Sequence, residues 1–178
     1  MDIGEKLKIF RSAGLGLPDD RLQLKPHDPQ WLTVAKDEIY GLISLLPSLH
    51  HVGSTAVPEL AAKPILDLIG GTENLTKLDE QNHLLQEQGY TPMGEFGIEG
   101  RRFFKFAHED TTYIHLHVFQ NTHPKIAEHI AFRDELIANP LARSTYENIK
   151  RQLEKSCTRQ AYSEAKNEII SRIQPKKS

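Results

Sequence analysis

The most regular alternation of apolar and polar positions in this chain lies at residues 112–119. The segment reads Thr-Tyr-Ile-His-Leu-His-Val-Phe, so that aliphatic side chains alternate with ring-bearing polar side chains. Successive side chains of a β-strand point to opposite faces of the sheet. The pattern therefore predicts a half-buried strand that carries Tyr113, His115 and His117 on one face and its aliphatic residues on the other.

Apolar positions at helical spacing predict helices in several other segments. The clearest begins at Asp28 and Pro29, because the aspartate accepts a hydrogen bond from a free N–H group and proline supplies a helical φ without needing a partner. This helix is expected to run to about residue 45. Helical spacing also predicts helices at residues 2–13, 74–88, 124–139, 140–156 and 162–173 and a turn of helix at 57–60. Short β-like runs predict strands at residues 49–52, 64–69, 90–93 and 102–107 and a weaker one within 15–25.

The order of these elements favours an α+β (mixed α/β) domain, with helices flanking a central mixed sheet. Residues 1–20 are expected to form a helical arm, residues 21–174 the domain and residues 175–178 a short tail. A chain of 178 residues with 38% hydrophobic residues can bury one core without disulfides.

Composition excludes several function classes. The 22 basic and 24 acidic residues give a formal net charge of -2, so a general attraction to nucleic acid or to an anionic membrane is not indicated. The single cysteine, Cys157, excludes a disulfide framework and a cysteine-based zinc cluster, and we interpret it as inert. The first residues lack an apolar signal segment, and no later apolar run is long enough to span a membrane. The protein is therefore expected to be soluble and cytoplasmic.

The main functional clue is a stretch that begins at His51 and ends at Asp67, and reads His-Val-Gly-Ser-Thr-Ala-Val-Pro-Glu-Leu-Ala-Ala-Lys-Pro-Ile-Leu-Asp. Gly53 permits close backbone approach to a ligand, and the hydroxyl groups of Ser54 and Thr55 can donate to phosphate oxygens. The alternative is an ordinary turn in which one of these hydroxyls caps a helix. His51 can bind a ligand, contact Asp67 or serve as a structural histidine.

Asp67 is a lone carboxylate inside an apolar run, where an acid usually has a specific role. A two-carboxylate metal site on this strand would need an acid two residues away, and both such positions are isoleucine. A neighbouring strand can complete a site with His115 and His117, and this mixed set of nitrogen and oxygen ligands suits Zn²⁺ or Mn²⁺ better than Mg²⁺. The alternative is that Asp67 accepts hydrogen bonds from loop amides or a histidine and orders the turn.

Three basic residues are candidates to balance the charge of an anionic ligand: Lys63, Arg101 and Arg102. Arginine suits phosphate or carboxylate groups because its guanidinium makes two-point contacts. Arg102 and Lys105 are expected to face opposite ways in a regular strand, so at most one of them serves the site. An ion pair with a neighbouring acid is the default expectation for Arg133.

The stretch from His51 to Asp67 closely resembles the signature of the GrpB family, also called UPF0157. Shorter motifs of that family follow in the expected order at residues 26–31, 100–104, 115–118, 129–134 and 162–166, so the resemblance covers about residues 22–173. It implies a nucleotidyltransferase-like fold, in which a Gly-Ser turn holds nucleotide phosphates and carboxylates bind Mg²⁺. By this resemblance Gly53 and Ser54 match the turn, and Asp67 matches the first acid.

The chain departs from the acidic pattern that the resemblance implies. The second acid position is Ile69, and the third falls near His115 or His117. Glu59 also stands where the family usually has glycine. The missing acids weigh against ordinary nucleotidyl transfer with two Mg²⁺ ions, whereas Glu59 is a smaller change that is expected to alter only the loop.

Two functions stay open. In the first, the protein binds a nucleotide or another phosphorylated small molecule in a pocket assisted by Mg²⁺, Mn²⁺ or Zn²⁺, and Asp67 is the catalytic residue of a nucleotidyl or phosphoryl transfer. In the second, the same pocket belongs to a non-catalytic binding or accessory module with a degenerate active site. Histidine-ligated metal hydrolysis ranks below both.

Overall fold

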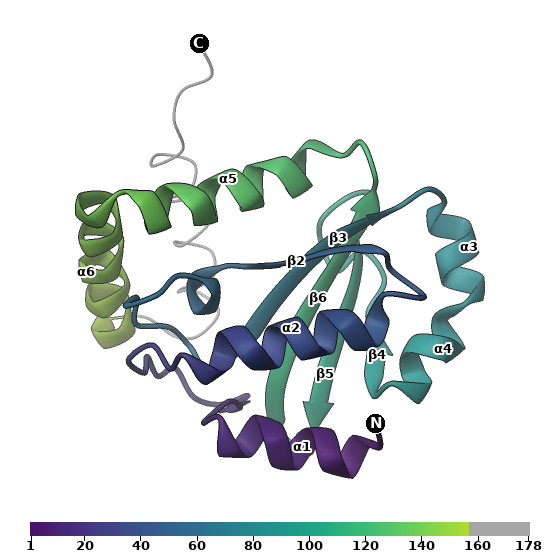
Figure 1. Cartoon of the computed structure of the whole chain (residues 1–178), viewed down its shortest axis with the longest axis horizontal. Coiled ribbons are helices and arrows are strands. Elements are labelled where there is room, and N and C mark those ends of the chain that lie inside the picture. Colours follow the sequence, from purple (N-terminus) through teal and green to yellow (C-terminus); the bar gives the residue numbers. More distant parts are fainter. Residues whose placement is uncertain (157–178) are drawn as a thin grey trace.

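A computed structural model describes residues 1–156 and shows a mixed sheet with helices packed on both of its faces (Figure 1). Its strands are β1 at Leu17–Pro18, β2 at Ser48–Val52, β3 at Leu66–Thr72, β4 at Tyr90–Pro92, β5 at Arg102–His108 and β6 at Thr111–Gln120. The sheet order is β2-β3-β6-β5-β4, and β1 pairs with the beginning of β6. Only the β3–β6 pair is parallel among these strands. The predicted α+β class with a central mixed sheet is confirmed.

Aspartate side chains bind free N–H groups at the start of two helices, and the one at Asp28 is the cap that the sequence predicts. The Asp2 carboxylate accepts a hydrogen bond from the Gly4 N–H at 3.2 Å, and the Asp28 carboxylate accepts one from the Gln30 N–H at 2.9 Å. Such bonds satisfy N–H groups that have no partner within the helix. The helices are α1 at Ile3–Ser12, α2 at Gln30–Leu42, α3 at Leu75–Glu80, α4 at Asn82–Glu87, α5 at Pro124–Ala138 and α6 at Pro140–Ser156, with a 3-10 turn, η1, at Ser54–Ala56.

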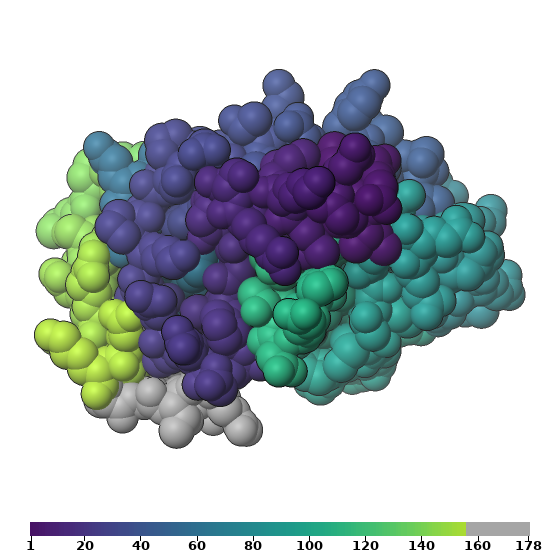
Figure 2. Space-filling view, turned by 90° about the horizontal axis from the view of Figure 1, so that it is seen from below, coloured from purple at the N-terminus to yellow at the C-terminus, as the bar shows by residue number. Residues whose placement is uncertain are grey.

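The main core lies between one face of the sheet and the N-terminal helices. Strand residues such as Leu68 and Leu116 pack there with Phe10 of α1 and Trp31 of α2, and all four are at most 2% exposed. Figure 2, which is seen from below, shows the residues of α1, in purple, across the surface that faces the viewer. Burial of large apolar side chains of this kind is the main favourable contribution to folding.

Among residues 1–156, α5 covers part of the opposite face. Val52, Ile69 and Phe119 form a small cluster on this face, with Ile126 and Ile130 of α5 packed against it. Farther along, α5 and α6 pack against the segment that follows η1, through side chains such as Phe132 and Tyr146. This face also carries polar residues of β3 and β6 that α5 does not cover.

A β-bulge changes the predicted alternation at the start of β6. Phe106 pairs with Ile114, whereas Ala107 pairs with Thr112, so Tyr113 is the extra residue. Its ring packs in the main core, 5.8 Å from the ring of Phe10. The prediction that Tyr113 shares the histidine face is therefore wrong, because an inserted residue reverses the facing of those before it.

Several predicted boundaries differ from the structure. Residues 20–24 form no strand; β1 lies earlier, and Lys25 makes an isolated bridge to Ala62. The helical turn expected at 57–60 is η1, three residues earlier. The helix expected at 74–88 is divided into α3 and α4 at Gln81. Periodicity cannot locate such divisions, because two short helices share the spacing of one longer helix.

A buried polar network joins α1 to the rest of the fold. Lys6 Nζ donates to Glu38 Oε1 at 2.8 Å, and the Tyr90 hydroxyl donates to the same oxygen at 3.0 Å. All three side chains are buried, and burial together with Glu38 raises the pKa of Tyr90. Since a buried charge is tolerated only when it is paired, this network fixes the position of α1 on α2 and β4.

The remaining expectations concern the ends of the chain and membranes. No helix among residues 1–156 is both long and apolar enough to cross a membrane. The helix expected at 162–173 and Cys157 lie outside the described residues. The division at residues 20 and 174, and a cytoplasmic location, stay predictions.

Replacing Lys6 with alanine is expected to lower the free energy of unfolding by about 3 kcal/mol, because the Glu38 carboxylate is then buried without its cation. Lys8→Ala, on the exposed side of the same helix, should change that free energy by less than about 0.5 kcal/mol. Urea denaturation followed by circular dichroism measures both variants. Equal stability of the two would show that the network does not fix α1.

Candidate functional site

The register of the sheet brings together residues from four separate segments. Asp67 of β3 pairs with Val52 of β2 on one side and with His115 of β6 on the other. His117, two residues along β6, pairs with Phe103 of β5. Because paired residues of adjacent strands point to the same face, these side chains share the sheet face that α5 covers in part. We call Asp67, Phe103, His115, His117 and the neighbouring Arg101 the histidine face.

Asp67 and His115 form a direct pair. His115 Nδ1 lies 3.2 Å from Asp67 Oδ1, and each side chain is 24% exposed. An ionised carboxylate can only accept, so His115 donates its Nδ1 proton, and in the neutral form of the ring this contact selects the tautomer whose lone pair is on Nε2. The alternative that Asp67 binds a histidine is therefore what the structure shows.

Gly53 brings the turn after β2 against Asp67. Its φ of 69° lies in the left-handed region, and a Cβ atom there would be 2.5 Å from Asp67 Oδ2. Only glycine meets both conditions without strain. Ser54 and Thr55 follow in η1 and are at most 8% exposed. The turn predicted to hold phosphate thus lies directly beside the carboxylate.

His51 is held within the fold. Its Nε2 lies 2.9 Å from Thr55 Oγ1, and its carbonyl oxygen accepts a hydrogen bond from Arg133 Nη1 at 2.9 Å. Burial lowers the pKa of His51 to about 4, with further lowering by Arg133 and partial opposition from Asp67. His51 and Thr55 therefore stabilise each other as neutral groups, as the structural alternative for His51 proposed. Arg133 also pairs with its neighbour Asp134 at 2.7 Å, as expected.

Arg101 is a buried cation at the edge of the histidine face. Its side chain donates to the carbonyl oxygens of Glu95 at 3.1 Å and Phe96 at 2.7 Å, and its Nη1 lies 3.2 Å from His117 Nδ1. Its guanidinium also stands 4.9 Å from the centre of the Phe103 ring. Arg101 is only 6% exposed, and no carboxylate among residues 1–156 forms an ion pair with it.

Burial keeps His117 neutral. The pKa of His117 is lowered to about 3, chiefly by burial and to a smaller extent by His115, Arg101 and His129, whereas Asp67 opposes the shift. Burial also lowers the pKa of Arg101, with no carboxylate to oppose that effect. Of the contacting pair Arg101 and His117, the arginine therefore carries the positive charge.

The other two predicted basic residues are Lys63 and Arg102, of which Arg102 does not lie beside the histidines. Arg102 faces away from the histidine face and binds both carboxylate oxygens of Asp79, at 2.7 and 2.8 Å. Lys105 faces the opposite way and pairs with Asp19 at 2.7 Å, as strand alternation predicts. Lys63 lies in the segment before β3. The structure thus brings Arg101, but not Arg102, beside the histidines.

The predicted metal ligands do not fit a bound cation as they are placed. His117 accepts a hydrogen bond from Arg101 at Nδ1, so its Nε2 carries the proton and offers no lone pair. Asp67 and His115 are paired with each other. Within residues 1–156 no three His, Cys, Asp or Glu side chains are arranged to hold a metal ion. Binding of Zn²⁺, Mn²⁺ or Mg²⁺ by Asp67, His115 and His117 stays a prediction.

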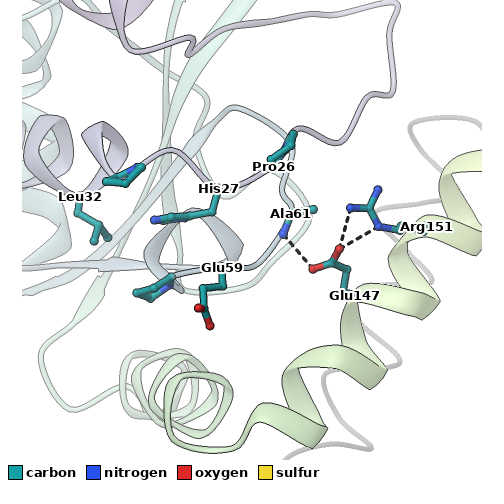
Figure 3. A pocket seen from close by; sticks show the side chains of 9 residues that line it. Pro26, His27, Leu32, Glu59, Ala61, Glu147 and Arg151 are labelled. Atoms are coloured by element: carbon teal, nitrogen blue, oxygen red, sulfur yellow. Dashed lines mark hydrogen bonds and ion pairs between the residues drawn. The ribbon is translucent and has the colours of Figure 1, made fainter.

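Two cavities lie away from the histidine face. One of about 430 Å³ is bounded by segments near His27 and Glu59 and by α6, where Glu147 accepts hydrogen bonds from Ala61 and Arg151 (Figure 3). The other, of about 360 Å³, lies between α2 and α5 and includes His51 among its lining residues. Of the predicted site residues, only His51 lines either cavity. These two cavities therefore do not mark the predicted site, whereas the buried charge and the paired groups of the histidine face are typical of functional sites.

Sequence reasoning did not identify the aromatic part of this face. The Phe103 ring lies 5.4 Å from the His115 ring and 5.1 Å from the His117 ring. His129 of α5 stacks on His117 at 6.3 Å. Strand alternation from Arg101 would have placed Phe103 on this face, whereas no local pattern indicates which helix residue covers His117.

Comparison with known proteins gives a consistent result. A family model described as GrpB protein matches residues 21–176. The glutamate-rich protein GrpB of Alkalihalophilus pseudofirmus is 34% identical over 147 residues, which cover 78% of this chain and 84% of that protein. The UPF0157 protein YqkA of Bacillus subtilis is 38% identical over 106 residues, which cover 60% of this chain but only 31% of that protein. A crystal structure of the conserved protein GrpB from Enterococcus faecalis superposes with a TM-score of 0.78 at 31% identity, covering 85% of this chain and 94% of the other.

Gly53→Ala is expected to destabilise the fold more than Gly94→Ala does. Both glycines have a positive φ, 69° and 63°, but a Cβ at Gly94 meets nothing within 4 Å. The left-handed conformation costs about 1–2 kcal/mol at either position, and the collision with Asp67 should add about 1–3 kcal/mol at Gly53. Urea denaturation measures the difference. The interpretation requires that Asp67→Ala, combined with Gly53→Ala, restores part of the loss.

Proposed function

The chain belongs to the GrpB family, and we propose that its histidine face binds a nucleotide or another phosphorylated small molecule. The observation that supports this proposal is Arg101, a buried guanidinium that lies beside His117 and that no carboxylate within residues 1–156 pairs with. A buried charge without a counter-ion is costly. A bound anion removes that cost, and a phosphate group matches the guanidinium geometry.

The contacts of Arg101 leave donors available for such a ligand. Its Nε and two terminal nitrogens each use one N–H group, on Glu95, His117 and Phe96. Each terminal nitrogen of a guanidinium carries a second N–H. The ligand approaches from the side of Asp67 and His115, which are 24% exposed.

Asp67 sets a limit on where the phosphate binds. Its carboxylate lies against the Gly53 turn, so an anion at that turn meets a like charge. The phosphate is therefore expected nearer to Arg101 and His117 than to the turn. A divalent cation between Asp67 and the phosphate would reverse this preference, which makes added metal an informative variable.

Arg101→Ala is expected to weaken binding of ATP, CTP, GTP or UTP by about 10- to 100-fold, the effect of losing charge-assisted hydrogen bonds. Arg102→Ala is the matched control, since the adjacent guanidinium binds Asp79 on the other face. Arg101→Lys keeps the charge but not the planar guanidinium, so its nucleotide affinity should lie between those of the two alanine variants. Isothermal titration calorimetry with and without Mg²⁺, Mn²⁺ or Zn²⁺ measures all three.

Two results would overturn this proposal. One is that the wild-type protein binds none of the four nucleotides with any of these metal ions. The other is that Arg102→Ala weakens binding as much as Arg101→Ala does. Metal titrations of Asp67→Asn and His117→Ala test the predicted metal ligands separately, since unchanged affinity in both variants would exclude that set.

The Asp67–His115 pair favours a second candidate, catalysis of phosphoryl or nucleotidyl transfer at the same face. A carboxylate that accepts the Nδ1 proton of a histidine leaves Nε2 free to act as a general base. His115 would take the proton of an attacking hydroxyl group or water as its oxygen bonds to phosphorus and the bond to the leaving group breaks. Without turnover, the same face serves as a binding module.

If the protein is catalytic, His115→Gln is expected to lower turnover by about 10²- to 10⁴-fold, the usual contribution of a general base. Asp67→Asn should also lower it, because an amide no longer fixes the ring proton. His108→Gln, at the exposed end of β5, is the control. Release of inorganic phosphate or pyrophosphate from each nucleotide measures the rate. Turnover that survives His115→Gln would remove this role, while calorimetry still reports binding.

A further inference from the structure

The loop between β4 and β5 exposes an aromatic ring beside the histidine face. Phe96 is 61% exposed and has a φ of 45°, which a residue with a side chain rarely adopts. One side of its ring stacks on Phe103, with the ring centres 5.1 Å apart and the planes 24° from parallel. Phe103 in turn contacts His115 and His117. A large apolar ring is therefore held at the surface in a fixed orientation.

Arg101 holds this loop in place. The same guanidinium that faces His117 donates to the carbonyl oxygens of Glu95 and Phe96. At the base of the loop, the Phe103 N–H donates to the Gly94 carbonyl oxygen at 2.8 Å. These bonds fix the uncommon backbone conformation of Phe96. Strained conformations persist where surrounding contacts enforce them, and they concentrate at ligand sites.

Core packing does not account for the position of Phe96. Its contact with Phe103 covers one side of the ring, and the rest is exposed to water. An exposed aromatic ring gains free energy when a second planar ring stacks on it. The guanidinium of Arg101, which donates to the Phe96 carbonyl oxygen, can attract an anionic group of the same ligand. A ring and an anion held together are the features of a nucleotide.

We propose that the exposed side of Phe96 is the stacking platform for the base of a nucleotide whose phosphates lie toward Arg101 and His117. This inference rests on the proposed function and assigns the ligand class within it. Every base offers a flat π-surface, so stacking of this kind discriminates little between bases. All four nucleotides are therefore expected to bind, and purines more tightly than pyrimidines because they cover more of the ring.

The experiment compares ligands with and without a base. Phe96→Leu keeps apolar contact with Phe103 but removes the aromatic surface, and it should weaken ATP binding by about 10-fold while leaving tripolyphosphate binding unchanged. Phe96→Trp should retain or improve ATP affinity. Ile98→Ala is the control, since Ile98 lies in the same loop and is 37% exposed. Isothermal titration calorimetry measures each pair.

Each outcome separates the two claims. If the wild-type protein binds tripolyphosphate and Phe96→Leu weakens the binding of ATP alone, both the phosphate site and the stacking platform are supported. If Phe96→Leu weakens both ligands equally, or neither, the platform is wrong while phosphate binding stands. If wild type binds neither ATP nor tripolyphosphate, the proposed function fails and the platform with it.

Discussion

The parallel pairing of β3 with β6 is the constraint on which the rest of this structure depends. It sets Asp67 beside His115 and Ile69 beside His117. A shift of one residue along this pair would turn every side chain of one strand to the opposite face. Buried residues such as Leu66 and Leu116 prevent that shift, because they would leave the main core. The position of the polar pair is thus fixed by apolar packing on the other side of the sheet.

The two faces of the sheet tolerate polar groups for different reasons. In the main core, Lys6 and Glu38 are both buried and neutralise each other. His117, on the histidine face, and His51, on the adjacent strand β2, avoid the cost of burial by having a lowered pKa, so that they carry no charge near neutral pH. Arg101 can do neither, since a guanidinium stays protonated and, within residues 1–156, no carboxylate forms an ion pair with it. This distinguishes Arg101 from the buried Lys6 and Glu38, which pair with each other.

The sequence allowed the fold and half of this site to be predicted. The alternation in β6 placed His115 and His117 together, and the lone acid Asp67 indicated a neighbouring strand as the source of its partner. Two features could not be predicted from the sequence. The bulge at Tyr113 depends on how β5 and β6 pair over distance. The choice between Arg101 and Arg102 depends on where β5 begins, and element boundaries are the least certain part of any pattern.

The packing around Ile69 disfavours a second acid at the position where the family resemblance implies one. Ile69 is 0% exposed and lies in the cluster with Val52 and Phe119, against which α5 packs. A carboxylate at this position would be buried among apolar side chains, at a cost that raises its pKa or displaces the helix. The docking of α5 therefore favours an apolar residue at position 69. The histidine face carries the Asp67 carboxylate and the Arg101 guanidinium, and we expect any chemistry of the face to use Arg101 and the paired His115.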